Sequence, residues 1–281
     1  MRYAVLSDVH ANLEALTAVL GRLKTLAVDR IVCLGDVVGY HADPGECLEL
    51  LRASGAHLIA GNHDRAATGK KDPSDFGFAA RRAVLWTQQK LQERDRRFLD
   101  ELPVFDQLDG FAVVHAALHP EPNEDLHLST RRRIDRSLAV LASGRFDAKI
   151  CFFGHTHRPV AHELRGSRYV SHSADRIVPL LPDGVYLVNP GSVGQSRDGD
   201  ERAAFLVYDT RATTIAFHRV AYDRAACLRK ARRAGLLHRE TRFGRAYRTL
   251  SVRAARALWY VQRARMPRAR SAITTAPIRI H

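Results

Sequence analysis

Two histidines one residue apart, in Gly154-His155-Thr156-His157, are the first residues in this chain that could do chemistry. They follow the apolar run 149–153, which predicts a buried strand that ends in a loop. On its own, a His-x-His pair in a loop is more often solvated than bound to a metal. The pair gains weight because other metal-binding residue types follow other predicted strands.

These strand-end side chains combine carboxylate, amide and imidazole groups. In chain order they are Asp8, His10, Asp36, Asn62, His63, His115, His155 and His157. Carboxylate oxygen with imidazole nitrogen suits Mn²⁺, Fe, Co²⁺, Ni²⁺ and Zn²⁺, whereas Mg²⁺ and Ca²⁺ prefer oxygen alone. The set is too large for one ion, so we expect two divalent ions about 3.5–4 Å apart, with Mn²⁺ favoured. Asp36 is the natural carboxylate to bridge them.

The elements that must position these groups alternate between strand and helix in the first third of the chain. Strands are predicted at Arg2–Leu6, Arg30–Leu34 and Ala56–Ala60, and helices at Asn12–Leu26, with Asn12 as the N-cap, and at Glu46–Arg52. This pattern is typical of an α/β sheet with ligands outside the carboxyl ends of its strands.

The rest of the chain turns from helices to short strands. Helices are predicted at Phe78–Leu91, Arg94–Leu102 and Arg131–Leu141, and a hairpin joins Pro103–Leu108 to Phe111–His115. Five short runs separated by turn residues follow, at Val160–Leu164, Tyr169–His172, Gly184–Val188, Ala203–Tyr208 and Thr213–His218. A parallel half followed by an antiparallel half predicts two sheets packed face to face with helices outside.

Composition indicates a globular protein. The chain has 281 residues, of which 46% are hydrophobic and 26% are charged. Its four cysteines form no Cys-x-x-Cys motif, so we expect reduced thiols and a cytoplasmic location. No apolar run approaches the roughly 20 residues of a membrane-spanning helix.

The net charge of +14 lies entirely in the last part of the sequence. Between Tyr222 and His281 there are fifteen Arg and one Lys but only two acidic residues, so the remainder is neutral. We therefore expect a catalytic domain at 1–221 and an arginine-rich, helical, partly disordered extension at 222–281. Two interpretations of the extension stay open: weak contact with nucleic acid or an anionic surface, and a solvated helix.

The strand-end motifs, taken together, resemble those of the calcineurin-like metallophosphoesterase superfamily. The matching segments are Asp8-x-His10, Gly35-Asp36, Gly61-Asn62-His63-Asp64, His115, Gly154-His155-Thr156-His157 and Val188-Asn189-Pro190-Gly191-Ser192-Val193-Gly194. The last segment is most similar to the small bacterial phosphodiesterase branch. The resemblance covers Met1 to about Leu237 and implies a four-layer αββα sandwich of two mixed sheets flanked by helices.

The resemblance also implies a role for each matching residue. One metal would be held by Asp8, His10 and His157, the other by Asn62, His115 and His155, with Asp36 between them. His63 would act as a general acid or charge stabiliser, and Asp64 would hold its imidazole in place. The implied enzyme is a dinuclear metal-dependent phosphoesterase, a phosphodiesterase or phosphatase, in which a metal-bridging hydroxide attacks a small phosphate ester in line.

Several assignments lie outside these motifs. Arg197 and Arg158 are candidates to clamp a phosphate, and Tyr40 and His41 to line the substrate pocket. We expect His119 and His127 to be surface residues. Three alternative functions stay open: a nuclease or polyanion-binding protein that uses the basic tail, an enzyme similar to protein phosphatases, and a scaffold without chemistry.

Overall fold

The computed structural model describes residues 1–122, 125–174 and 177–237. Its helices are α1 (Leu13–Leu23), α2 (Pro44–Ala53), α3 (Asn62–Thr68), α4 (Phe78–Lys90), α5 (Glu93–Glu101), α6 (Arg131–Ala142) and α7 (Arg224–Arg233), with a 3₁₀ turn η1 (Pro73–Asp75). Its strands are β1 (Arg2–Leu6), β2 (Arg30–Cys33), β3 (His57–Leu58), β4 (Phe105–Leu108), β5 (Phe111–Val114), β6 (Ile150–Phe153), β7 (Val160–Arg165), β8 (Arg168–Ser173), β9 (Ile177–Pro179), β10 (Val185–Asn189), β11 (Ala203–Asp209) and β12 (Thr214–Val220).

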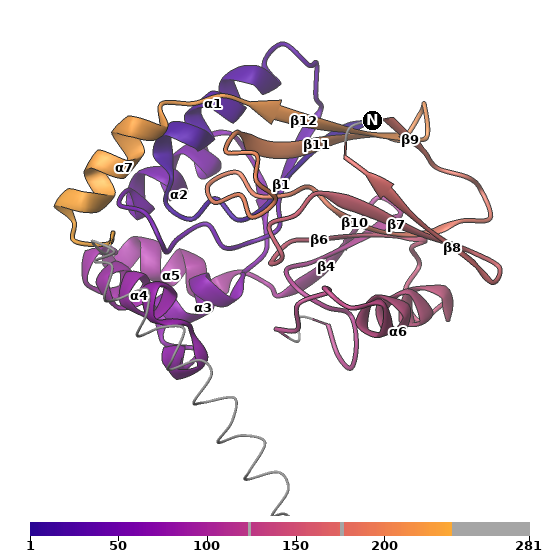
Figure 1. Cartoon of the computed structure of the whole chain (residues 1–281), viewed down its shortest axis with the longest axis horizontal. Helices are drawn as coiled ribbons and strands as arrows, with labels where there is room; N and C mark the ends of the chain where they lie inside the picture. The colour runs from indigo at the N-terminus through magenta and orange to yellow at the C-terminus, as the bar shows by residue number, and fades with distance from the viewer. Residues whose placement is uncertain (123–124, 175–176, 238–281) are drawn as a thin grey trace, which may run out of the picture. The chain divides into compact units, whose positions relative to one another are not determined.

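Two six-stranded sheets form the centre of the molecule (Figure 1). The first has the order β3-β2-β1-β11-β12-β9, and the second has the order β4-β5-β6-β10-β7-β8. The first sheet is mixed because β1 pairs in parallel with β2 and antiparallel with β11, and the second is mixed because β10 pairs in parallel with β6 and antiparallel with β7. The predicted fold class is confirmed.

Successive side chains along each strand point to opposite faces of the sheet, and this alternation produces the layers of the fold. In β1, Tyr3 and Val5 face the core between the sheets, whereas Ala4 and Leu6 face the core under α1 and α2. The same period of two operates in β6, where Phe152 belongs to the core between the sheets and the neighbouring side chains pack with α6. The two sheets therefore share one buried core, and helices cover their outer faces.

The two sheets do not correspond to a parallel first half and an antiparallel second half of the chain, as the sequence had suggested. The late strands β11 and β12 return to the first sheet beside β1, and β10 pairs in parallel with β6. Each sheet therefore draws on both halves of the chain. Sequence periodicity gives each strand's buried faces but not its neighbour, which can lie more than 200 positions away in the chain, as β11 does from β1.

The compact unit extends to Leu237, beyond the expected domain boundary at residues 221 and 222. Helix α7 packs onto this unit: Ala231 is fully buried against Ala83 of α4, and Lys230 forms ion pairs with Glu14 at 2.6 Å and Asp43 at 2.8 Å. The expected extension beyond residue 237 lies outside the described residues. Within the described part of the chain, no helix has the length and apolar character needed to cross a membrane.

Most local boundaries agree closely with the predicted ones, but strand β9 was not predicted and the segment near residue 62 differs. As predicted, Asn12 caps α1, its side chain accepting a hydrogen bond from the Ala15 amide at 3.1 Å. Helix α3 was not predicted, however, and it begins at Asn62 itself. The segment expected to be a strand-end loop is thus the first turn of a helix, which fixes the backbone of Asn62, His63 and Asp64.

Candidate metal centre

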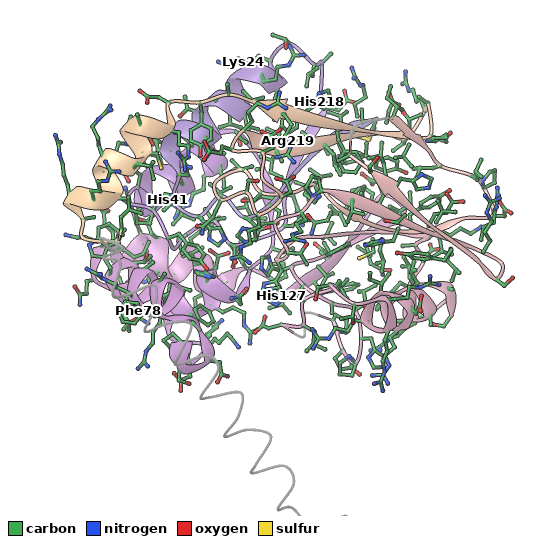
Figure 2. All side chains as sticks on the ribbon, in the orientation of Figure 1. Lys24, His41, Phe78, His127, His218 and Arg219 are labelled. Atoms are coloured by element: carbon green, nitrogen blue, oxygen red, sulfur yellow. The ribbon has the colours of Figure 1, made fainter. Side chains whose placement is uncertain are left out.

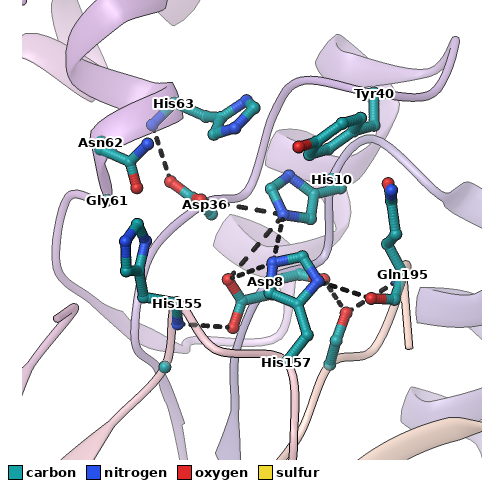
Figure 3. A network of polar contacts seen from close by, with 12 residues as sticks. Asp8, His10, Asp36, Tyr40, Gly61, Asn62, His63, His155, His157 and Gln195 are labelled. Carbon is teal, nitrogen blue, oxygen red and sulfur yellow. Dashed lines mark hydrogen bonds and ion pairs between the residues drawn. The ribbon is translucent and has the colours of Figure 1, made fainter. Parts of the chain in front are cut away.

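The expected ligands converge where the carboxyl ends of the strands from both sheets meet (Figure 3). Asp8 and His10 follow β1, Asp36 follows β2, His115 follows β5, and the two loop histidines follow β6. Asn62 comes from the first turn of α3. Of these side chains His155 is the most exposed, and only 8% of its surface is accessible.

Five of the seven candidate ligands have a left-handed backbone conformation. Their φ angles lie between 52° and 63°, at Asp8, His10, Asp36, His155 and His157. This conformation costs a residue with a side chain about 1 kcal/mol or more. Strained backbone at three different strand ends that face one cluster indicates a site whose function requires that geometry.

The first ligand group joins Asp8, His10 and His157. The Nε2 atoms of the two histidines lie 3.2 Å apart, and Asp8 Oδ1 is 3.2 Å from His157 Nε2. Both rings use Nδ1 for a backbone carbonyl, His10 with Val38 at 3.1 Å and His157 with Gln195 at 2.5 Å. A carbonyl only accepts, so each Nδ1 carries the proton, and in the neutral rings the two Nε2 lone pairs face one another.

The second group joins His115, His155 and Asn62. The Nδ1 atom of His115 donates to the Leu34 carbonyl at 2.8 Å, while its Nε2 atom lies 3.1 Å from Asn62 Oδ1. Asp36 stands between the groups, because its Oδ2 atom is 3.3 Å from His115 Nε2 and 3.7 Å from His10 Nε2. Both expected ligand sets are therefore assembled, with Asp36 between them.

This donor set fits metal ions. Ligand-type atoms of Asp8, His10 and His157, and likewise of Asp36, His115 and His155, lie within 4.8 Å of one another. Asp8 Oδ1 and His155 Nε2 are buried and have no hydrogen-bond partner among the described residues. Converging lone pairs and orphaned acceptors are costly without a cation, because each buried polar atom loses its contact with water.

The charges of the cluster support each other in the metal-free protein. Burial opposes ionisation of Asp36, but the charges of His115 and His63 outweigh it and hold its pKa well below the usual range. Burial likewise disfavours charged His115, yet the Asp36 carboxylate raises the pKa of this histidine to about 10. For His10, burial and the neighbouring histidines outweigh the attraction of Asp36 and Asp8, and they lower its pKa well below the ordinary value.

The structure contradicts one expected contact, between Asp64 and the His63 ring. The Asp64 carboxylate accepts hydrogen bonds from the backbone amides of Gly61 at 3.0 Å and Val38 at 3.1 Å. His63 Nδ1 is buried without a hydrogen-bond partner in the described part of the chain. As an N3 residue, Asp64 is close to the free amide at the start of α3, and that amide takes its carboxylate. Asp64 therefore fixes the backbone that presents His63.

A cavity of about 330 Å³ opens beside the ligands. His63 and Tyr40 line it, as does Arg197, whose guanidinium donates to the Tyr40 hydroxyl at 3.2 Å. Arg158 is not in its wall; this side chain donates to the Arg197 carbonyl at 3.1 Å and supports the loop instead. His41 also points elsewhere, its Nδ1 donating to the His10 carbonyl at 2.9 Å.

His127 is the residue that sequence reasoning placed least well. It is exposed, as expected, but it also lines the cavity, and its ring centroid is 4.1 Å from that of His155. Figure 2 labels His127 on the loop before α6 and His41 beside the helices of the first half of the chain. No motif surrounds His127, and only its position after β5 and His115 links it to the site.

Other wall residues come from the segment between α3 and α4. Phe76 lines the cavity, and Lys71 reaches across it to pair with Asp125 at 2.7 Å. No motif marks this segment, so the sequence does not indicate which of its side chains turn inward. A loop's placement depends on the surface beneath it, and local residue types do not reveal that surface.

The loop that carries both histidines is fastened to the end of β10. Asn189 donates to the Gly154 carbonyl at 2.7 Å and to the Thr156 hydroxyl at 3.0 Å. Its side-chain oxygen accepts from the Gly191 amide at 2.8 Å. Asn189 thus acts as a turn residue and also holds the backbone of the loop that carries the two imidazoles.

Comparison with known proteins agrees with this arrangement. The model of the calcineurin-like phosphoesterase superfamily domain matches residues 1–213. An uncharacterized protein of Methanocaldococcus jannaschii is 36% identical over 222 residues, which are 78% of this chain and 87% of that protein. A metallophosphoesterase from Sphaerobacter thermophilus is 37% identical, with a TM-score of 0.68 over 85% of this chain and 95% of that one.

A hypothetical protein of Pyrococcus horikoshii OT3 has the same TM-score of 0.68 at 18% identity, over 84% of this chain and 94% of the other, a likeness of fold alone. The family model covers most of the described residues and contains every candidate ligand. This chain belongs to the calcineurin-like phosphoesterase superfamily.

Proposed function

We propose that this protein is a hydrolase of small phosphate esters that works with two divalent metal ions. Asp8, His10 and His157 would hold one ion. Asn62, His115 and His155 would hold the other, with Asp36 shared between them. The observation that carries the proposal is the convergence of nitrogen and oxygen lone pairs in a buried cluster. The clearest case is the 3.2 Å distance between His10 Nε2 and His157 Nε2.

A bound pair of divalent ions supplies Lewis-acid stabilisation of a phosphate and a water that is acidic near neutral pH. The mixed ligand shell suits Mn²⁺, and also Fe, Co²⁺, Ni²⁺ and Zn²⁺. The protein contributes the geometry. Backbone carbonyls orient the rings of His10, His115 and His157 so that Nε2 of each faces the centre.

His63 is the proposed residue for the leaving oxygen of the substrate. Burial lowers its pKa to about 4, so in the free protein the ring is neutral. A neutral imidazole still donates one N–H hydrogen bond, and an anionic phosphate beside it favours the charged form. Because Nδ1 is buried, Nε2 is the nitrogen available to the cavity. His63 would thus give a hydrogen bond or a proton to the departing oxygen.

Arg197 is the proposed cation for the non-reacting phosphate oxygens. It lines the cavity together with Asp36 and His157, and its guanidinium donates to the Tyr40 hydroxyl at 3.2 Å. The cavity volume of about 330 Å³ is at the low end of the usual range for small-molecule sites. Both features support a small phosphodiester or phosphomonoester as substrate.

A turnover screen after metal reconstitution tests the proposal. Metal-free protein would be loaded with Mn²⁺, Fe²⁺, Co²⁺, Ni²⁺ or Zn²⁺ and assayed with bis-nitrophenyl phosphate, nitrophenyl phosphate, cyclic nucleotides and dinucleoside polyphosphates. We expect turnover with at least one ester, strongest with Mn²⁺, and abolished in Asp36→Ala. Absence of turnover with every combination would overturn the enzyme assignment and favour a scaffold.

A further inference from the structure

The His63 ring is held by other rings instead of by a hydrogen bond. The centroids of the Tyr40 and Phe76 rings each lie 4.8 Å from the His63 centroid, at interplanar angles of 33° and 38°. The ring of the proposed ligand His10 is a third neighbour, also at 4.8 Å and edge-on at 71°, so Tyr40 and Phe76 are the two neighbouring rings outside the proposed metal ligands. Both Asp64 oxygens are engaged by backbone amides, and His63 Nδ1 has no hydrogen-bond partner in the described part of the chain. Contacts with aromatic neighbours are therefore the restraint that this imidazole has.

The two rings come from separate loops. Tyr40 follows β2 and has a left-handed backbone with φ of 58°, while Phe76 is the C-cap of the 3₁₀ turn η1, which follows α3 in the chain. In the described residues Tyr40 and Phe76 make no ring contact with each other, so they approach His63 from different directions. Gly39 closes the Nδ1 side, since a Cβ there would collide with that nitrogen.

We propose that Tyr40 and Phe76 are positioning residues that fix the plane of the His63 ring so that Nε2 points at the leaving oxygen. This inference rests on the proposed function of His63. Two ring contacts restrict tilting of the imidazole, each with an aromatic-pair energy that exceeds simple burial. Because the rings form no hydrogen bond with Nδ1, they restrain the imidazole without fixing its protonation state.

Substitution of Phe76 tests the positioning role more cleanly than substitution of Tyr40, because Phe76 has fewer other contacts in the site. Tyr40 also contacts the His10 ring at 4.7 Å and accepts a hydrogen bond from Arg197, so changing it disturbs a proposed metal ligand and a proposed phosphate ligand. Among the described residues, the ring of Phe76 contacts only that of His63, and Phe76 is half-buried in the cavity wall. Its loss should therefore act on the imidazole and leave the metal ligands in place.

A double-mutant cycle between Phe76 and His63 tests the inference. The variants are Phe76→Leu, His63→Ala and the double substitution, each loaded with the best metal from the screen. We expect Phe76→Leu to lower kcat about 3- to 10-fold, with KM within about twofold, and to cause no further loss in the His63→Ala background. The loss should be greater for a diester with an alkyl leaving group than for bis-nitrophenyl phosphate, because the alkoxide needs a proton more.

Matched variants complete the design. Phe76→Tyr, which retains the ring, should recover most of the kcat lost in Phe76→Leu. Leu85→Ala removes an exposed apolar side chain from α4 and should leave turnover and metal content unchanged. A readout without turnover is the crystallographic order of the His63 ring in metal-free protein, which should fall in Phe76→Leu but not in Leu85→Ala.

The possible outcomes distinguish failure of the positioning role from failure of the proposed catalytic role of His63. Full activity of His63→Ala would overturn the catalytic role of His63, and the positioning role with it. If His63→Ala is impaired but Phe76→Leu lowers kcat equally in both backgrounds, or changes only KM, the positioning role fails while the proposed function stands. Loss of metal from Phe76→Leu would likewise overturn the positioning role.

Discussion

The Nε2 atoms of His10 and His157 lie 3.2 Å apart although both rings already donate their Nδ1 protons to backbone carbonyls. The two residues are separated by 147 positions in the chain, and their side chains are 2% exposed or less. Two acceptors in such contact repel unless a proton or a metal ion lies between them. This relationship makes the cluster a metal site in our interpretation, rather than a polar network that stabilises the fold.

Substitution of single ligands should separate the two proposed ions. We expect His157→Ala and His155→Ala each to lose about one ion per chain, and Asp36→Ala to lose both, because Asp36 is the only ligand proposed to touch both ions. Turnover should fall at least about 100-fold in each variant. Metal content measured by mass spectrometry after dialysis tests this, with His57→Ala, a partly exposed histidine outside the site, as the control.

Equal loss of affinity for both ions in His155→Ala and in His157→Ala would contradict the assignment of the two histidines to different ions. Metal analysis also tests the role of Thr156, which separates the two histidines. Because Thr156 is fastened to Asn189, a longer loop in place of residues 154–157 should weaken both ions together.

Glycine substitutions provide a second test, since Gly61 and Asp36 are in tight contact. A Cβ at Gly61 would overlap Asp36 Oδ1 and the Asp36 amide. We expect Gly61→Ala to displace that carboxylate, to destabilise the fold by about 1–3 kcal/mol and to lower metal content. Gly21→Ala in α1, where nothing lies within 4 Å of the new Cβ, should instead stabilise the protein by roughly 0.5–1 kcal/mol. Chemical denaturation and metal analysis measure both effects; unaltered metal binding in Gly61→Ala would argue against the bridging position of Asp36.

The sequence predicted the family and the candidate ligands because they are local signals. Each ligand lies within a few residues of a strand end, and strand ends can be recognised from apolar periodicity. The fold class and the family are confirmed, while the assignment of each ligand to a metal remains a proposal supported by geometry. Asp64 shows the limit of this method: its neighbour His63 suggested a contact, but the free amide at the start of an unpredicted helix takes the carboxylate.

What the sequence did not predict depends on contacts between distant segments. Phe76, Lys71 and His127 line the cavity because two loops fold over it, and no period or motif marks them. Similarly, the return of β11 to the side of β1 is decided by burial of both faces of β1 and not by residues near β11 alone. Arg158 was expected in the pocket because it is next to His157, yet consecutive residues in an extended loop point in different directions.

The structure distinguishes Arg197 from Arg158, the two candidates for binding the substrate phosphate. Arg197 lines the cavity, whereas Arg158 is exposed and donates to the Arg197 carbonyl. We expect Arg197→Ala to raise KM for nitrophenyl phosphate about tenfold, the loss of a charge-assisted hydrogen bond. Arg158→Ala should change KM less than about threefold. Steady-state kinetics of the two variants test this, and a larger effect of Arg158→Ala would exclude Arg197 as the main phosphate ligand.

Removal of residues 239–281 tests the basic tail. The compact unit ends at Leu237, so we expect turnover of a small ester to stay within about twofold. Binding of single-stranded DNA should be measured for both proteins at two salt concentrations. Salt-sensitive binding that is lost with the tail would support the polyanion-binding interpretation, and equal behaviour would support a solvated extension. A large loss of ester turnover would contradict the independence of the compact unit.

Stability in mild acid should depend on His162, which is remote from the proposed ligands on β7. It is 6% exposed, its Nδ1 accepts from the Tyr169 hydroxyl at 2.9 Å, and burial, with a smaller effect of Arg131, lowers its pKa to about 4. Above pH 6.5 the ring is neutral in both states. Between pH 6.5 and about 4, His162 is protonated in the unfolded chain but stays neutral in the folded chain. The free energy of unfolding therefore falls as pH falls, by up to about 3 kcal/mol.

His162→Gln retains a hydrogen-bond acceptor for Tyr169 but does not titrate in this range. Its stability should therefore decline less than that of the wild type between pH 6.5 and 4, although it starts lower at pH 7 because a buried ring contact with Phe153 is lost. Urea denaturation at several pH values gives both curves, and titrations common to the two proteins cancel in their difference. Parallel curves would mean that His162 takes up its proton in the folded state near pH 6.5, which would contradict a ring kept neutral by burial.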